Sequence, residues 1–250
     1  MRSVIVIAIA IIIQLATETT SHAYQLQPIS RVFAPAGSKA TQSFDVINDS
    51  AERIAVTVSF VTLERDESYV ETNRDADDDF LAYPPQMILA PHGRQTVRVS
   101  WLGTPIPARE LVYRIVVTQV PVELLDHSKA DPGAAGSMRI MITYRGTLLI
   151  RPAKAIPAVQ VRNAEPSVVD GKRGLAIVLE NTGSAVGLVK DCSIALVSGA
   201  GSPVTIPPPA LAVLHNTRVL AGGKRRYLVP WPAGMTAGPV KATGRCSVEP

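Results

Sequence analysis

The strongest constraint in the sequence is an alternation of apolar and polar side chains with a period of two. It is clear at residues 43–47, 54–60, 95–101 and 113–117, which are rich in Val, Ile, Thr and aromatic residues. This period places every second side chain on one face of a strand. Turn-forming triplets such as Asn48-Asp49-Ser50 and Pro91-His92-Gly93 separate the runs. Short, regularly spaced strands with such turns predict an all-β sandwich.

The strand pattern is interrupted near residues 151–157, where Pro152 and Pro157 frame a short, stiff link. A second set of strands is expected beyond the link, in a region richer in Pro and Gly, at residues 176–181, 186–198, 217–220, 225–229 and 240–246. We therefore expect two β-sandwich domains, one of residues 24–152 and one of residues 153–250.

The first 23 residues have the features of an export signal. Arg2 supplies a positive charge, residues 4–13 form an unbroken apolar run, and Ser21 and Ala23 stand as the small residues of a cleavage site. The apolar run is short for a membrane-spanning helix. The sequence thus predicts a cleaved signal peptide at residues 1–23 and an exported chain, with an uncleaved N-terminal anchor as the alternative.

The chain has two cysteines, Cys192 and Cys246, both in its last quarter. In an exported protein such a pair favours one structural disulfide. Two free thiols are the alternative. A redox C-x-x-C motif is absent from the sequence.

Several functional classes find no support in the sequence. The net charge is only +4, and aromatic residues make up 5% of the chain, without a basic stripe that would favour nucleic-acid binding. The four histidines lack metal-ligand spacing. The sequence also lacks a nucleophile elbow, a P-loop and a dinucleotide fingerprint. We therefore predict no catalytic residue, no metal, no cofactor and no small-molecule substrate.

Residues 138–145 form an alternating segment that follows a polar, small-residue loop at residues 124–137. By strand parity Met138, Ile140, Ile142 and Tyr144 share one face. An ordinary core strand would show this pattern. The other interpretation is an edge strand that offers its large side chains to another chain, a known mode of recognition.

Three stretches resemble the periplasmic pilus chaperones of chaperone–usher systems: residues 84–99, 113–122 and 144–152. The first is the most specific, with a proline-led strand, a Pro-x-Gly-type turn and a strand that carries Val-Arg-Val. The likeness covers residues 24–152 well and the second domain loosely, and it is greatest to the branch that serves archaic-type pili. It implies two immunoglobulin-like domains in an L-shaped arrangement, with a cleft that holds the C-terminal carboxylate of a pilus subunit.

The resemblance also assigns roles to residues. Met138, Ile140, Ile142 and Tyr144 match the donor strand that completes a subunit's sandwich, and Arg145 matches a basic residue of the cleft, although an exposed strand residue would look the same.

The second cation of the cleft is either Arg31 or Arg98. Arg31 is one residue out of the family's register, and such a slip reverses the face of a strand side chain. Gln119 stands near the place of the family's acidic interdomain residue, which puts the family's interdomain ion network in doubt for this chain and frees Arg98 for another role.

The sequence therefore predicts a non-catalytic, ATP-independent periplasmic chaperone. It would hold pilus subunits by strand donation, pass them to an outer-membrane usher, and associate with itself when free. The alternative is an exported structural or adhesive β-sandwich, such as a pilus subunit or a carbohydrate-binding module. A subunit should have one domain and an N-terminal donor extension, whereas this chain has two predicted domains and an internal donor segment.

Overall fold

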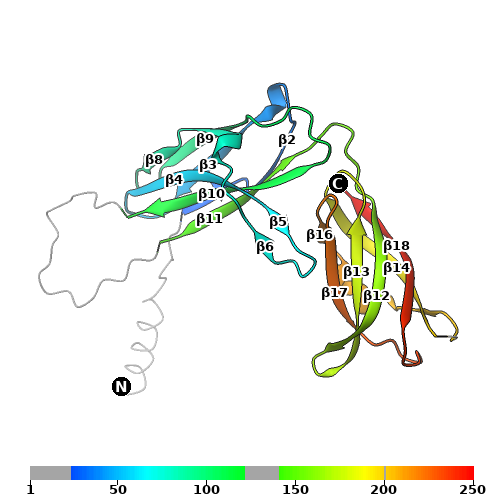
Figure 1. The fold of residues 1–250 in the computed structure, drawn as a ribbon. Helices are drawn as coiled ribbons and strands as arrows, with labels where there is room; N and C mark the ends of the chain where they lie inside the picture. The colour runs from blue at the N-terminus through cyan, green and yellow to red at the C-terminus, as the bar shows by residue number, and fades with distance from the viewer. Residues whose placement is uncertain (1–23, 122–140, 200) are drawn as a thin grey trace, which may run out of the picture.

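The computed structural model describes residues 24–121, 141–199 and 201–250, and these form two β domains with a bent overall outline (Figure 1). Each domain has its own buried apolar cluster, one built from residues between Tyr24 and Ile150 and one from residues between Val159 and Met235. The two-domain immunoglobulin-like architecture expected from the sequence is confirmed. The predicted signal peptide, the small-residue loop, Met138 and Ile140 lie outside the described residues.

The N-terminal domain is a sandwich of two sheets. The four-stranded sheet has the order β1 (Tyr24–Gln27), β3 (Thr41–Asn48), β9 (Arg94–Trp101) and β7 (Phe80–Tyr83). The five-stranded sheet has the order β2 (Ser30–Phe33), β11 (Thr143–Ile150), β10 (Leu111–Val120), β4 (Ile54–Thr62) and β8 (Gln86–Leu89). Neighbouring strands are antiparallel except β2, which runs parallel to β11. The predicted runs at residues 43–47, 54–60, 95–101 and 113–117 all fall within strands of this domain.

Aromatic side chains from both sheets fill the space between them. The ring of Phe80 is stacked 4.6 Å from Phe60 and meets the edges of Trp101 and Tyr113, each at 5.1 Å between centroids. Offset and edge-to-face arrangements are those that aromatic quadrupoles favour. From Val97 to the end of β9 the alternation is regular, since Val97, Val99 and Trp101 are buried while Arg98 is exposed. The two-residue period therefore builds this core.

The C-terminal domain is one seven-stranded sheet with a buried apolar side. Its strands are β12 (Val159–Val169), β13 (Lys172–Asn181), β14 (Gly187–Ser198), β15 (Val204–Thr205), β16 (Thr217–Val219), β17 (Lys224–Pro230) and β18 (Val240–Glu249). The disulfide predicted between Cys192 and Cys246 is present and joins the neighbouring strands β14 and β18. The sequence missed β12, which begins directly after the link.

Helical structure is confined to short 3₁₀ turns in the part of the chain that the structure describes. These are η1 (Ser38–Ala40), η2 (Asp77–Asp79) and η4 (Pro208–Leu214). Within the same residues no helix has the length and apolar character needed to cross a membrane. A small hairpin of β5 (Glu64–Arg65) and β6 (Glu71–Thr72) leaves the N-terminal domain between β4 and β7 and extends toward the C-terminal domain (Figure 1).

Candidate functional site: the open edge of strand β11 and the interdomain cleft

Strand β11 has one open edge along its first half. Its full-length neighbour β10 pairs with residues 143–150, in a register that includes Tyr144 opposite Val117. On the other side β2 pairs only with residues 147–150, because β2 is four residues long. Residues 143–146 therefore have no strand partner on that side among the described residues. An unpaired strand edge is a template for pairing with another chain.

The C-terminal part of the predicted donor segment faces the interior of its own domain. Ile142 and Tyr144 pack partly buried against the N-terminal core, on the same side as Leu148 and Ile150. The ring of Tyr144 lies 4.9 Å from that of Tyr24 at a steep angle. Tyr144 thus lies at the edge of the core, and the alternation predicted from the sequence holds from Ile142 into β11.

Tyr24 anchors the start of this segment. Its hydroxyl lies 2.5 Å from the carbonyl oxygen of Val117 and 3.0 Å from that of Ile142. Burial raises the pKa of Tyr24 to about 12, so the phenol stays protonated and donates. The backbone amide of Gln119 also donates to the Ile142 carbonyl, at 3.2 Å. The end of the donor segment is therefore fixed before β11 begins.

Arg145 lies on the opposite, outward face of β11, within a cluster of three arginines around one carboxylate. Glu71 on β6 accepts from Arg114, at 2.7 and 3.1 Å, and from Arg65 at 2.9 Å. The guanidinium of Arg145 hydrogen-bonds Asn73 and lies 3.6 Å from Glu71. The hydrogen bonds from Arg114 hold the pKa of Glu71 at about 2, against the opposing effect of burial.

This cluster has an excess of positive charge, because one carboxylate faces three guanidinium groups. Arg114 and Arg65 are mostly covered, whereas the side chain of Arg145 is 47% exposed. Arg145 is therefore the member of the cluster that an incoming anion could reach. A guanidinium can bind a carboxylate through two hydrogen bonds.

The two candidates for a second cation lie on different sheets. Arg31 is on β2, opposite Leu148 in the register of β11, and is exposed. Arg98 is on β9, beside Tyr83 of β7, and is exposed on the four-stranded sheet. The register thus places Arg31 on the strand next to β11, on the side of the sheet that Leu148 shares and opposite the outward face of Arg145, while Arg98 lies on the other sheet.

The interdomain contact does contain an acid, Glu110, although Gln119 stands near the place where the family has its acid. The buried Glu110 carboxylate accepts from Arg151 Nε and from the Val186 amide, each at 2.7 Å. The Glu110 amide donates to the Ser184 carbonyl oxygen at 2.7 Å. Gln119 is near the opposite end of β10, beyond reach of the link. Glu110 stands directly before an apolar strand, and nothing in the local pattern marks it as buried.

A small cavity of about 220 Å³ lies between the domains beside this contact. Its walls combine apolar and polar side chains, with Ser30, Val32 and Leu149 from the N-terminal domain and Val186, Leu188 and Arg218 from the C-terminal domain. It opens next to the β2–β11 pair, on the side that carries the outward face of β11. The cleft therefore lies beside the paired half of β11, and the open edge at residues 143–146 precedes that half in the same strand.

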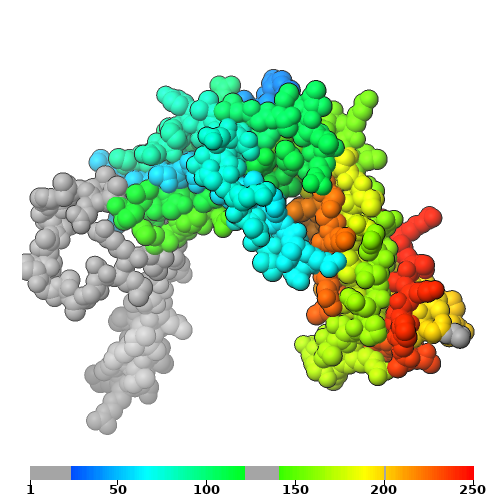
Figure 2. Space-filling model, in the orientation of Figure 1, coloured from blue at the N-terminus to red at the C-terminus, as the bar shows by residue number. Residues whose placement is uncertain are grey.

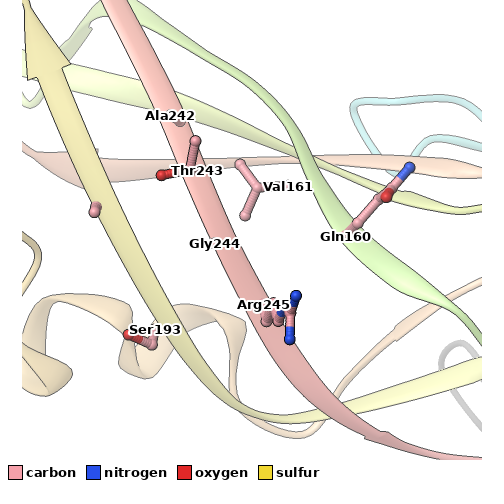
Figure 3. Close-up of a pocket in the computed structure, with 8 residues that line it drawn as sticks. Gln160, Val161, Ser193, Ala242, Thr243, Gly244 and Arg245 are labelled. Carbon is pink, nitrogen blue, oxygen red and sulfur yellow. The ribbon is translucent and has the colours of Figure 1, made fainter.

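A larger, open hollow of about 570 Å³ lies on the C-terminal domain, over β12, β14 and β18 (Figure 3). The residues that line it are Gln160, Val161, Ser193, Ala195, Ala242, Thr243, Gly244 and Arg245. They include no pair of an acid with a base or nucleophile, so this lining does not support catalysis. Among the described ranges no group of three His, Cys, Asp or Glu residues could hold a metal ion.

The fold and this site define a two-domain immunoglobulin-like sandwich protein with a strand edge beside an interdomain cleft. The family model "Pili and flagellar-assembly chaperone, PapD N-terminal domain" matches residues 27–155. The chain belongs to this family of assembly chaperones, which is not a family of enzymes. No curated protein matches the chain.

Solved structures of chaperones share the fold at low sequence identity. The class 5 fimbriae chaperone CfaA is 15% identical, with a TM-score of 0.55 over 91% of this chain and 99% of its own. The CsuC–CsuE chaperone–tip subunit complex of the archaic Csu pili of Acinetobacter baumannii is 11% identical. Its TM-score is 0.51, over 82% of this chain and 89% of its own. The structure of the Salmonella enterica SafB chaperone in complex with the SafA pilin is 16% identical. Its TM-score is 0.50, over 92% of this chain and 98% of its own. That this chain is of the archaic branch stays a prediction.

Proposed function

We propose that this chain is a periplasmic chaperone that holds pilus subunits by lending them residues 138–144, and then delivers them to an outer-membrane usher. The observation that carries the proposal is the open edge of β11, which is continuous with the alternating segment before it. Family membership supports the chaperone role, and two similar structures, CsuC–CsuE and SafB–SafA, are complexes of a chaperone with a pilus subunit.

Strand donation suits the physical properties of this edge. The backbone of an added strand supplies affinity through hydrogen bonds, and alternate side chains supply specificity by filling pockets. Met138, Ile140 and Ile142 would fill a subunit's groove, and Tyr144 would mark the end of the donated segment at the chaperone's own core. A subunit covered in this way cannot expose its unpaired strands to aggregation.

The subunit's terminal carboxylate would bind Arg145, and Arg31 and Arg98 stay the two candidates for the second cation. Arg145 supports this role by its partial exposure within an arginine-rich cluster. Arg31 lies on β2, beside β11, but on the face of the sheet opposite Arg145, and Arg98 lies on the other sheet. We further propose that residues 1–23 are a signal peptide cleaved on export, and that the domains comprise residues 24–152 and 153–250.

The proposal predicts that an acidic residue in the donated face abolishes subunit capture. Ile140→Asp and Ile142→Asp each place a charge where a subunit's apolar groove would have to bury it, at a cost of several kcal/mol. Thr143→Asp is the matched control, because Thr143 is exposed on the outward face. Co-purification of subunit from the periplasm is the measurement, with circular dichroism to establish folding.

Subunit recovery near zero for both Ile variants and near wild type for Thr143→Asp would support strand donation. Folded Ile140→Asp and Ile142→Asp proteins that capture subunit at wild-type yield would refute it.

The Arg145→Ala variant should also lower subunit recovery, because it removes the exposed cation of the cluster.

A further inference from the structure

The β5–β6 hairpin makes a contact with the C-terminal domain that is separate from the contact at the link. It leaves the N-terminal domain on the inner side of the bend and reaches toward β16 and β17 (Figures 1 and 2). At its tip the backbone amide of Arg226 on β17 donates to the carbonyl oxygen of Glu67, at 2.7 Å. The hairpin thus spans the two domains along a second path.

The turn at the tip of the hairpin is closed by its own hydrogen bonds. The Asp66 carboxylate accepts from the Val70 amide at 2.8 Å, and the Asp66 carbonyl accepts from the Tyr69 amide at 3.0 Å. Tyr69 has a φ of 69°, a left-handed conformation that is costly for a bulky side chain. The turn therefore fixes the direction of the Tyr69 side chain.

The Tyr69 ring lies between two arginines from different domains. The guanidinium carbon of Arg65, on β5, is 3.7 Å from the ring centroid, and that of Arg225, on β17, is 3.5 Å away. Two guanidinium groups cannot share one face of a ring at these distances, so they cover opposite faces. Each contact is a cation–π interaction of close geometry. Arg225 is itself oriented by a hydrogen bond to the Arg218 carbonyl oxygen, at 3.2 Å.

The base of the hairpin is fixed to the N-terminal domain through Glu71. Its carboxylate binds Arg114 of β10 through both oxygens. Arg65 connects base and tip, since its guanidinium donates to Glu71 and also covers Tyr69. The tip is therefore connected to β10 by ion pairs.

The other contact between the domains lies at the link. There Glu110 joins Arg151 to the Val186 amide, and Arg109 packs against Gly222. A single contact of this kind would leave rotation about it as the easy motion between domains. A second attachment at a separate place restricts that rotation.

We propose that the β5–β6 hairpin is a strap that fixes the angle between the two domains, with Tyr69 as its positioning residue. The strap joins β17 to β10 through Arg225, Tyr69, Arg65, Glu71 and Arg114. It also contacts Arg145, so the angle of the domains and the position of that cation depend on one element. This proposal does not require the chaperone function to hold.

The test measures the distribution of distances between the domains in the whole exported chain. Nitroxide labels are placed on ketone-bearing residues incorporated at Gln95 and Lys241, two exposed strand positions in different domains. This chemistry leaves the Cys192–Cys246 disulfide intact. Pulsed electron–electron double resonance then compares the distance distribution of the wild type with those of Tyr69→Leu, Tyr69→Phe and Val70→Ala. Val70 is the matched control, because it is 60% exposed in the same turn.

For Tyr69→Leu we expect the fraction of molecules outside the wild-type distance range to rise about fivefold, which corresponds to roughly 1 kcal/mol of lost cation–π attraction. Tyr69→Phe keeps the aromatic face and should restore the wild-type distribution, as should Val70→Ala. Arg225→Gln, which leaves the turn untouched, should broaden it like Tyr69→Leu. Unchanged distributions for Tyr69→Leu and Arg225→Gln would overturn the proposal, as would equal broadening by Tyr69→Phe.

Discussion

At the scale of residues, two buried or half-buried carboxylates organise the arginines of this protein. Glu110 holds Arg151 and the C-terminal domain at the link, and Glu71 holds Arg65 and Arg114 under the hairpin. Both acids are far better covered than the carboxylate of Glu64, which pairs with Arg74 at the surface. Exposed pairs contribute little to stability, whereas loss of one partner from a covered pair leaves a charge unpaired.

Substitution of Glu110 tests the contact at the link. Glu110→Ala should lower the free energy of unfolding by roughly 3 kcal/mol, because Arg151 and the Val186 amide both lose their acceptor in a covered site. Urea unfolding followed by tryptophan fluorescence measures the change. Glu64→Ala is the control and should change stability by about 0.5 kcal/mol or less. A similar small effect of both variants would contradict the role given to Glu110.

The pKa of Glu71 predicts a pH dependence of stability. Its folded-state pKa is lowered from 4.5 to about 2, so the unfolded chain takes up the proton first as the pH falls. The stabilisation is therefore complete above the ordinary pKa and is lost as the pH falls toward 2. Between about pH 5 and about pH 3 the wild type should lose stability more steeply than Glu71→Gln. Parallel stability curves for the two proteins would show that Glu71 has no such role.

At the scale of elements, sequence patterns predicted the strands with a clear apolar pattern and missed β12, which lacks one. Residues 96–101 alternate strictly between polar and apolar side chains and form most of β9. Strand β12 alternates poorly, since it contains Pro166 and a register shift between Val161 and Asn163. A bulge breaks the period of two, and Pro argues against a strand. Pairing with β13 overrides both local signals.

The residues of the candidate site could be predicted only where a local sequence pattern marks them. Ile142, Tyr144 and Arg145 follow from strand parity and from the family's motifs around β11. The cluster around Glu71 could not be predicted, because a short hairpin brings that residue to β10 and β11 from a distant part of the chain. Glu110 was missed for a similar reason, since its partners are Arg151 on the link and an amide of the other domain.

At the scale of the whole molecule, strand β11 and the β5–β6 hairpin lie on the inner side of the bend that the two domains form (Figures 1 and 2). The link contact and the hairpin connect the domains around a cavity that adjoins β11. The central claim is that the edge of β11 and the segment before it complete the fold of a pilus subunit.

Amide hydrogen exchange of the chaperone, free and bound to a subunit that co-purifies with it, tests this claim most directly. Donated backbone groups become hydrogen-bonded to the subunit, so the amides of residues 138–146 that face the new partner should exchange at least about 100-fold more slowly in the complex. Exposed amides on β7, at the far edge of the four-stranded sheet, serve as the internal control and should not change. Unchanged exchange at residues 138–146, with new protection elsewhere, would contradict the account.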